Sequence, residues 1–171
     1  MKIRTGGPGD LPATLALLDG AVEWLTARGH AGQWGTRPWS SRPPAVERVT
    51  RYAEEYLLRV AETGGRVVGV CVLAEERPDY APPVDGRELY LRLLVTDRAL
   101  SGSGIGAALV EDAVAETRRR GIRLLRVDCY AGGEGRLVRQ YEALGFTRAQ
   151  PFAVSREEGD PWPGQILERR A

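Results

Sequence analysis

The apolar positions that follow Asp10 recur with the period of a helix. They are spaced four and three residues apart and share one helical face: Leu11, Leu15, Leu18, Val22 and Leu25. Asp10 stands directly before them and is a residue type that caps helix N-termini. The pattern predicts an amphipathic helix that begins after Asp10 and ends before Gly29.

The remaining segments alternate between strand-like and helix-like patterns. Strands are expected at 2–6, 56–62, 66–73, 88–95, 122–130, 146–155 and 165–169. Further helices are expected at 44–54, at 104–120 and around 137–144, with loops at 29–44 and 76–86. The order β, α, α, β, β, β, α, β, α, β, β contains no repeat or linker. It predicts a single mixed α/β domain over residues 1–171.

Composition narrows the function classes. The 24 basic and 23 acidic side chains are interspersed and leave a net charge of +1, so we expect neither a nucleic-acid nor a membrane partner. No apolar run approaches about 18 residues, which predicts a cytoplasmic protein. His30 is the only histidine, which argues against a metal centre. Cys71 and Cys129 lie in apolar runs and are predicted to be reduced and buried.

A glycine-rich turn joins a strand to a helix in the second half of the chain. Gly102-Ser-Gly-Ile-Gly-Ala107 follows the strand at 88–95 and opens the helix at 104–120. This geometry directs unpaired backbone N–H groups and the positive end of a helix dipole at one point. The turn therefore predicts a binding site for a phosphate or pyrophosphate group.

Three interpretations of this turn are open. The spacing G-x-G-x-x-A, with Asp128 at the end of the next strand, matches a dinucleotide fingerprint and would indicate an oxidoreductase. However, a hairpin precedes the turn, and too few residues follow it for further βαβ units of about 30 residues each. A loop without a ligand is disfavoured, because three glycines at a helix start cost backbone entropy without adding packing. The third interpretation rests on a longer resemblance.

Four segments of the second half carry this resemblance: Leu93-Leu-Val95, Ser101-Gly-Ser-Gly-Ile-Gly-Ala-Ala-Leu109, Leu124-Leu-Arg-Val-Asp-Cys129 and Tyr141-Glu-Ala-Leu-Gly-Phe146. In this order and spacing they resemble the GNAT superfamily of acyl-CoA-dependent N-acetyltransferases. The resemblance implies an α/β GNAT fold. Its central, mixed, mostly antiparallel twisted sheet would have about six to seven strands, flanked by about four helices.

The resemblance also implies an acetyl-CoA site that needs no metal. In the family, backbone amides of the turn bind the pyrophosphate, and here they belong to Ser101, Gly102, Ser103, Gly104, Ile105 and Gly106. The strand before the turn diverges from the next strand. The pantetheine arm of the coenzyme then pairs with the free backbone of Leu93, Leu94 and Val95.

Two positions depart from the family pattern. Ser101 stands where Gln or Arg is usual, so one positive charge near the phosphates is missing. We expect weaker CoA binding, or compensation by Arg98 or by an arginine of the last helix. Glu134 stands where many relatives carry Asn, and its charge does not favour a nearby phosphate.

The resemblance also indicates catalytic groups. Tyr141 matches the tyrosine that gives a proton to the leaving CoA thiolate, although its spacing from Leu137 and Leu144 equally suits a core residue. Glu88 begins the central strand, where relatives often place a glutamate base, and a solvated strand end is the alternative. Glu23 and Asp128 are weaker candidates for the base, and Asp128 is expected to pair with an arginine.

Aromatic residues indicate where the second substrate binds. In the family, the segment between the first two helices and the terminal loop flank that site. We therefore predict substrate contacts for Trp34 and Trp39, and also for Tyr90, which shares a strand face with Glu88. Trp24 is expected to pack against the core instead.

The predicted reaction is direct transfer of acetyl from acetyl-CoA to the primary amine of a small molecule, or to a peptide N-terminus. A CoA-sensing domain without catalysis is the non-enzymatic alternative, since a fold does not determine a function. The sequence leaves a homodimer open.

Overall fold

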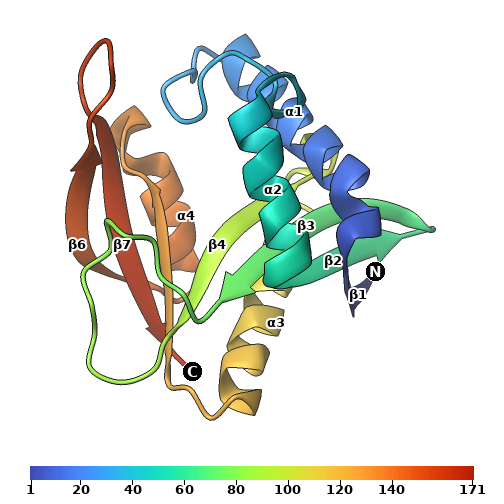
Figure 1. Cartoon of the computed structure of the whole chain (residues 1–171), viewed down its shortest axis with the longest axis vertical. Helices are drawn as coiled ribbons and strands as arrows, with labels where there is room; N and C mark the ends of the chain where they lie inside the picture. Colours follow the sequence, from blue (N-terminus) through green and yellow to red (C-terminus); the bar gives the residue numbers. More distant parts are fainter.

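The computed structural model describes residues 1–171 as one seven-stranded sheet with helices on both faces (Figure 1). The strands are β1 (Lys2–Thr5), β2 (Leu57–Thr63), β3 (Arg66–Ala74), β4 (Leu89–Thr96), β5 (Leu124–Tyr130), β6 (Thr147–Val154) and β7 (Trp162–Arg170). The α-helices are α1 (Leu11–Ala27), α2 (Pro43–Glu55), α3 (Ile105–Arg119) and α4 (Arg136–Ala143). No helix is both long enough and apolar enough to span a membrane.

The strands lie in the order β1-β2-β3-β4-β5-β7-β6. Every neighbouring pair is antiparallel except β4 and β5, which are parallel. This is the mixed, mostly antiparallel sheet of the GNAT fold, so the predicted fold class is confirmed. The position of β7 between β5 and β6 is additional information that the sequence pattern did not supply.

Two hydrophobic clusters hold the helices against the sheet. On one face, Leu109 and Val114 of α3 and Tyr141 of α4 pack with the strands. On the other face, Leu18 of α1 and Val49 of α2 do the same, and Figure 1 shows these two helices side by side. The predicted apolar face of α1 is confirmed in its buried members, Leu18, Val22 and Leu25.

Asp10 precedes α1 but does not cap it. Its side chain makes no capping hydrogen bond to that helix. Instead, the carboxylate accepts a hydrogen bond from the Gly7 N–H at 3.0 Å and pairs with Arg4 on β1 at 2.7 Å. The prediction of a cap is corrected because Pro8–Asp10 forms a separate 3₁₀ turn that turns this side chain back toward β1.

The central strands separate beyond a short paired segment. β4 pairs with β5 only over Leu89–Leu91, opposite Leu125–Val127. On its other side β4 carries a bulge at Arg92, since Val72 faces Leu93 and Leu73 faces Leu91. The β4 edge formed by Leu93–Val95 therefore has no strand partner on the β5 side. This confirms the divergence that the resemblance implied.

Candidate active site

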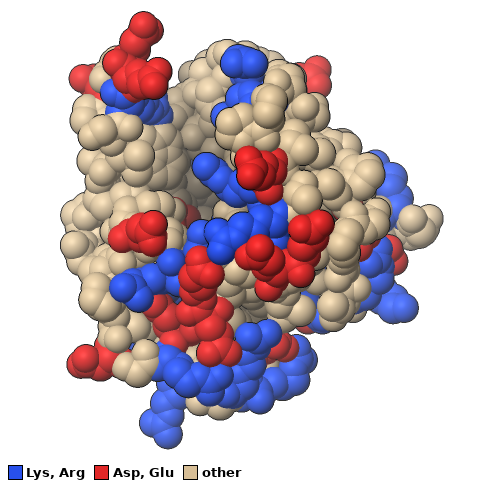
Figure 2. All heavy atoms as spheres, viewed as in Figure 1, with Lys and Arg blue, Asp and Glu red and all other residues tan.

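A cleft of about 640 Å³ occupies the gap between β4 and β5. It reaches from the glycine turn before α3, past Tyr141 and Asp128, to aromatic side chains of the segment between α1 and α2. Figure 2 shows a hollow between the two halves of the molecule, with basic side chains along its lower margin. Leu93 and Leu94 line the cleft, whereas the predicted contacts Val95 and Ser103 do not.

The glycine turn has the geometry that was predicted for an anion site. Gly102 and Gly104 have φ values of 84° and 83°, which side-chain-bearing residues rarely adopt. Gly104 is the N-cap of α3 and offers no side-chain cap, so the first amides of the helix have no intrahelical partner. Cβ atoms built at Gly102 and Gly104 would meet nothing within 4 Å. The first turn of α3 thus presents unpaired backbone donors, whereas the predicted amides of Ser101 and Ser103 already donate to the carbonyls of Arg98 and Leu100.

Arg98 stands beside the turn and lines the same cleft. Its guanidinium lies 5.1 Å from the ring centre of Trp24, which therefore packs against a site residue. Arg98 forms no ion pair, and burial together with repulsion from Arg136 lowers the pKa of Arg98. Ser101, exposed at the start of the turn, offers only a hydroxyl. Arg98 thus places a positive charge beside the turn, whereas Arg136 of α4, which repels Arg98, does not line the cleft.

Tyr141 combines a packed ring with a free hydroxyl. The residue is 7% exposed, and its ring lies edge-on to Phe146, 5.6 Å between centroids. The residue also lines the cleft, and protein atoms do not enclose its hydroxyl oxygen. Burial raises the pKa of Tyr141, so the phenol stays protonated at neutral pH. Both sequence interpretations of Tyr141, as a core residue and as a cleft residue, are compatible with this placement.

Asp128 lies on β5 and binds two tyrosines, not the arginine that was expected. The hydroxyls of Tyr90 and Tyr80 both donate to Oδ2, at 2.7 and 2.9 Å. Oδ1 accepts no hydrogen bond and is not enclosed, so it faces the cleft that Asp128 lines. Burial raises the pKa of Asp128, and the two hydroxyls offset part of that shift. A raised pKa makes this carboxylate a stronger base than an ordinary aspartate.

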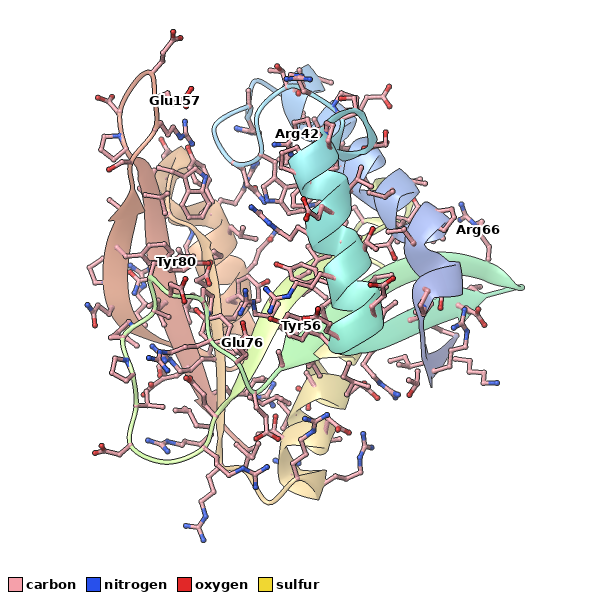
Figure 3. The ribbon with its side chains drawn as sticks, in the orientation of Figure 1. Arg42, Tyr56, Arg66, Glu76, Tyr80 and Glu157 are labelled. Atoms are coloured by element: carbon pink, nitrogen blue, oxygen red, sulfur yellow. The ribbon has the colours of Figure 1, made fainter.

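Tyr80 comes from the loop between β3 and β4. Figure 3 shows it lying over the part of the sheet formed by β5, β7 and β6. Its ring stacks on Phe152 at 4.8 Å between centroids. No periodic pattern in 76–86 signals this contact, so the sequence alone does not predict it.

Glu88 does not line the cleft. It is 6% exposed, and its Oε2 accepts a hydrogen bond from Arg126 Nη1 at 2.9 Å. The alternative of a solvated strand end is therefore wrong. The structure brings Glu88 together with Arg126 and with the carbonyl of Pro82, which the same Nη1 contacts at 2.9 Å, and not with Tyr141.

The aromatic end of the cleft is lined by residues that we term the acceptor lobe: Trp34, Trp39, Arg48, Tyr52, Tyr80, Arg92, Asp128 and Trp162. Trp34 and Trp39 meet edge to face, with 5.6 Å between ring centroids. Tyr90 is 0% exposed, so its predicted substrate contact is corrected: it reaches the lobe only through Asp128. Trp162 Nε1 donates to the Gln33 carbonyl at 2.9 Å and fastens β7 to the α1–α2 segment.

Cys71 lies outside the cleft, whereas Cys129 lines it. Cys71 and Cys129 are free and buried, as predicted. Burial raises the pKa of Cys129 to about 12, so its thiol is a poor nucleophile at neutral pH. No group of three His, Cys, Asp or Glu side chains is placed to hold a metal ion.

Comparisons with known proteins identify the family and the fold. Residues 16–146 match the family described as "Acetyltransferase (GNAT) family". No curated protein sequence matches the chain significantly.

Similar solved structures share the fold. A ribosomal-protein-alanine N-acetyltransferase from Brucella melitensis is 23% identical, with a TM-score of 0.70 and full coverage of both chains. The yncA protein from Salmonella typhimurium, solved with acetyl-CoA, is 20% identical, with a TM-score of 0.67 over 99% of this chain and 92% of that one. A GCN5-related N-acetyltransferase from Rhodopseudomonas palustris is 19% identical, with a TM-score of 0.72 over 99% and 95% of the two chains. The chain belongs to the acetyltransferase (GNAT) family, and its family and fold support acetyl transfer as its activity.

Proposed function

We propose that this protein transfers the acetyl group of acetyl-CoA to the primary amine of a small molecule by direct attack in a ternary complex. The observation that carries this proposal is the continuous cleft. It joins a turn with unpaired amides, an unpaired strand edge, a protonated phenol and a carboxylate of raised pKa. Acetyl-CoA supplies a thioester-activated acetyl group and a thiol leaving group.

The residues of this chain fit such a donor. The first-turn amides of α3, with Arg98, would hold the diphosphate, because the amides lack intrahelical partners and Arg98 lacks a carboxylate. The unpaired β4 edge at Leu93–Val95 would hydrogen-bond the pantetheine arm as an added strand does. Both features lead toward Tyr141, where the thiol would lie.

Two side chains would move the protons: Asp128 of β5, and Tyr141 of α4, which packs on the opposite face of β5. Val127 and Cys129 pack toward α3 and α4, so Asp128, which lies between them, points to the other face. There, Oδ1 of Asp128 would take the proton of the amine, directly or through water. The hydroxyl of Tyr141, on the α4 side, would give a proton to the leaving thiolate sulfur.

Two measurements test the proposal in sequence. Acetyl-CoA should raise the unfolding temperature and NADH should not, because only a ligand of the native state stabilises by mass action. Thiol release with a panel of amines then separates an enzyme from a CoA sensor. No stabilisation by millimolar acetyl-CoA contradicts the proposal, and binding without thiol release favours the sensor.

The compensation for Ser101 has its own test. Arg98→Gln should raise the Kd for acetyl-CoA about tenfold or more, since a charged hydrogen bond is worth about 1.5–3 kcal/mol. Ser101→Arg should lower that Kd only slightly if Arg98 already supplies the charge. The matched control is Arg118→Gln on α3, which makes the same change in charge away from the cleft. Equal Kd values for Arg98→Gln and the wild type would exclude this role.

A further inference from the structure

Two arginines of the acceptor lobe have no carboxylate partner. Arg59 pairs with Asp112 at 2.7 Å and Arg126 pairs with Glu88 at 2.9 Å, but neither Arg48 nor Arg92 forms an ion pair. Arg48, exposed on α2, makes no hydrogen bond within the protein. The lobe therefore holds two unpaired cations beside the single carboxylate of Asp128. This balance favours a ligand that carries negative charge at the arginine end.

Arg92 is held in place while most of its donors stay free. Its Nη1 donates to the Glu76 carbonyl at 2.8 Å, and its guanidinium lies 5.5 Å from the ring centre of Tyr56. Figure 3 shows Tyr56 and Glu76 near each other beside the lower end of α2. The Glu76 carboxylate is already paired with Arg51 at 3.3 Å. The Nε and Nη2 donors of Arg92 remain without a partner, and a fixed guanidinium fork suits a planar carboxylate.

A further unsatisfied donor lies at the wall of the lobe. Trp39 is 7% exposed and lines the cleft, yet its indole Nε1–H has no hydrogen-bond acceptor in the protein. Enclosed polar groups are normally paired, and this one lies beneath the surface of the cleft, so the wall of the lobe is incompletely satisfied. The rings of Trp34 and Tyr52 add apolar walls for the body of that ligand.

We infer that the acetyl acceptor is an amino-acid-like molecule, a primary amine that also carries a carboxylate or similar oxyanion. This inference rests on the acetyl-transfer function proposed above. The amine lies at Oδ1 of Asp128, and the oxyanion lies at Arg92 and Arg48, which face the same lobe. A polyamine would bring a second cation against the two arginines. A peptide N-terminus would place a neutral amide where the arginines require an anion.

Matched sets of acceptors test this assignment. Phenylalanine, phenylalaninamide and phenethylamine share one amine and one ring, and methionine and glutamate with their amides and decarboxylated amines extend the series. We expect kcat/KM, measured by thiol release, to be at least tenfold higher for each amino acid than for its amide. The amide has the less basic amine and so more of the reactive free base, which makes the test conservative. Equal or better turnover of the amides or simple amines overturns the inference and leaves the acetyl-transfer function standing.

Two variants locate the anion site. Arg92→Gln and Arg48→Gln should each raise KM for the amino acid about tenfold, without changing KM for its amide or the Kd for acetyl-CoA. The control is Arg37→Gln, an exposed arginine of the α1–α2 segment that does not line the cleft. A shift of the pH–rate profile without loss of the acid–amide preference would mean that Arg92 acts only through Asp128, and would overturn the assignment.

A separate readout applies if acetyl-CoA binds but no member of the panel releases thiol. N-acetylphenylalanine and its amide are then titrated into the CoA complex by calorimetry. The acid is expected to bind at least tenfold more tightly, and Arg92→Gln to abolish the difference. Equal binding, or no binding of either compound, overturns the inference. Failure of acetyl-CoA itself to bind would instead contradict the proposed function.

Discussion

The hydroxyl of Tyr141 has no partner in the protein, which makes its chemical role separable from its packing. In Tyr141→Phe the ring and its contact with Phe146 remain, so the unfolding temperature should stay the same. The kcat should fall about 100-fold or more, the usual contribution of a positioned acid, and KM for acetyl-CoA should not rise. Steady-state kinetics and thermal unfolding measure both effects. Unchanged kcat would restrict Tyr141 to the core.

The ionised side chain of Asp128 is expected to lower the stability of the fold and to be needed for activity. The pKa of Asp128 is higher in the folded protein than in the unfolded chain. The protein is therefore stabilised by the protonated carboxyl group at low pH, and it loses this stability as the pH rises from the pKa of the unfolded chain through that of the folded protein. Asp128→Asn removes the ionised form, so at pH 7 the variant should unfold at the same or a higher temperature than the wild type. Its kcat should fall about 100-fold or more, and the acidic limb of the pH–rate profile should disappear.

Asp85→Asn, in an exposed loop position outside the cleft, is the matched control for Asp128→Asn. It should change neither the kinetics nor the pH profile. A pH profile that keeps its acidic limb in Asp128→Asn would assign the proton acceptor to another group.

Local sequence explains part of this residue-level chemistry. Tyr141 could be predicted because a short motif fixes it relative to Gly145 and Phe146. The partners of Asp128 could not, because Tyr80 lies in a loop rich in proline and glycine whose path no period describes. Tyr90 was assigned to the correct strand, but its burial depends on how Ala81 and Ile166 cover it.

At the scale of elements, the glycines of the strand–turn–helix unit are expected to have two different roles: Gly104 is needed for its backbone conformation, and Gly106 for the approach of the coenzyme. Gly104 has a φ of 83°, so Gly104→Ala should lower the free energy of unfolding by about 1–2 kcal/mol. Gly106 lies inside α3, and a Cβ there would meet only Thr96, at 3.9 Å. Gly106→Ala should therefore raise stability by up to about 1 kcal/mol, since alanine favours the helix.

The same Gly106→Ala variant should bind acetyl-CoA about tenfold or more weakly, because the added methyl group stands where a diphosphate would approach the backbone. Thermal unfolding and calorimetry on the two variants measure the separation. A stabilised Gly106→Ala protein with unchanged affinity would show that the coenzyme does not approach this face of the turn.

Element boundaries were predicted where a period or a glycine marks them, as at both ends of α3 and at the hairpin of β2 and β3. The start of β7 was placed at 165, because Asp160-Pro-Trp-Pro has the composition of a loop. The structure begins this strand at Trp162, which pairs with Val154 of β6 and donates to the Gln33 carbonyl. Such long-range pairing overrides local propensity and leaves no local signal.

For the whole molecule, the sheet consists of two parts that meet only at the short β4–β5 pairing. The gap opens toward the glycine turn, where the proposed substrates would enter. At the closed end, Glu88 and Arg126 form a buried pair beneath the loop that carries Pro82. The sequence indicated the separation of the strands, because the family motif includes it. It did not indicate the pair that holds the closed end, since Glu88 and Arg126 are distant in sequence and match no motif.

The closed end therefore gives Glu88 a structural role in place of the base predicted from sequence. Glu88→Gln leaves Arg126 buried, with Nε already unpaired, and should lower the free energy of unfolding by about 3–5 kcal/mol. For a chain of this size the unfolding temperature should fall by roughly 10 °C. Glu75→Gln breaks only surface pairs, with Arg87 and Arg120, and should have little effect. Measured well below unfolding, Glu88→Gln should keep most of its kcat; a stable protein that loses catalysis 100-fold would restore Glu88 as the base.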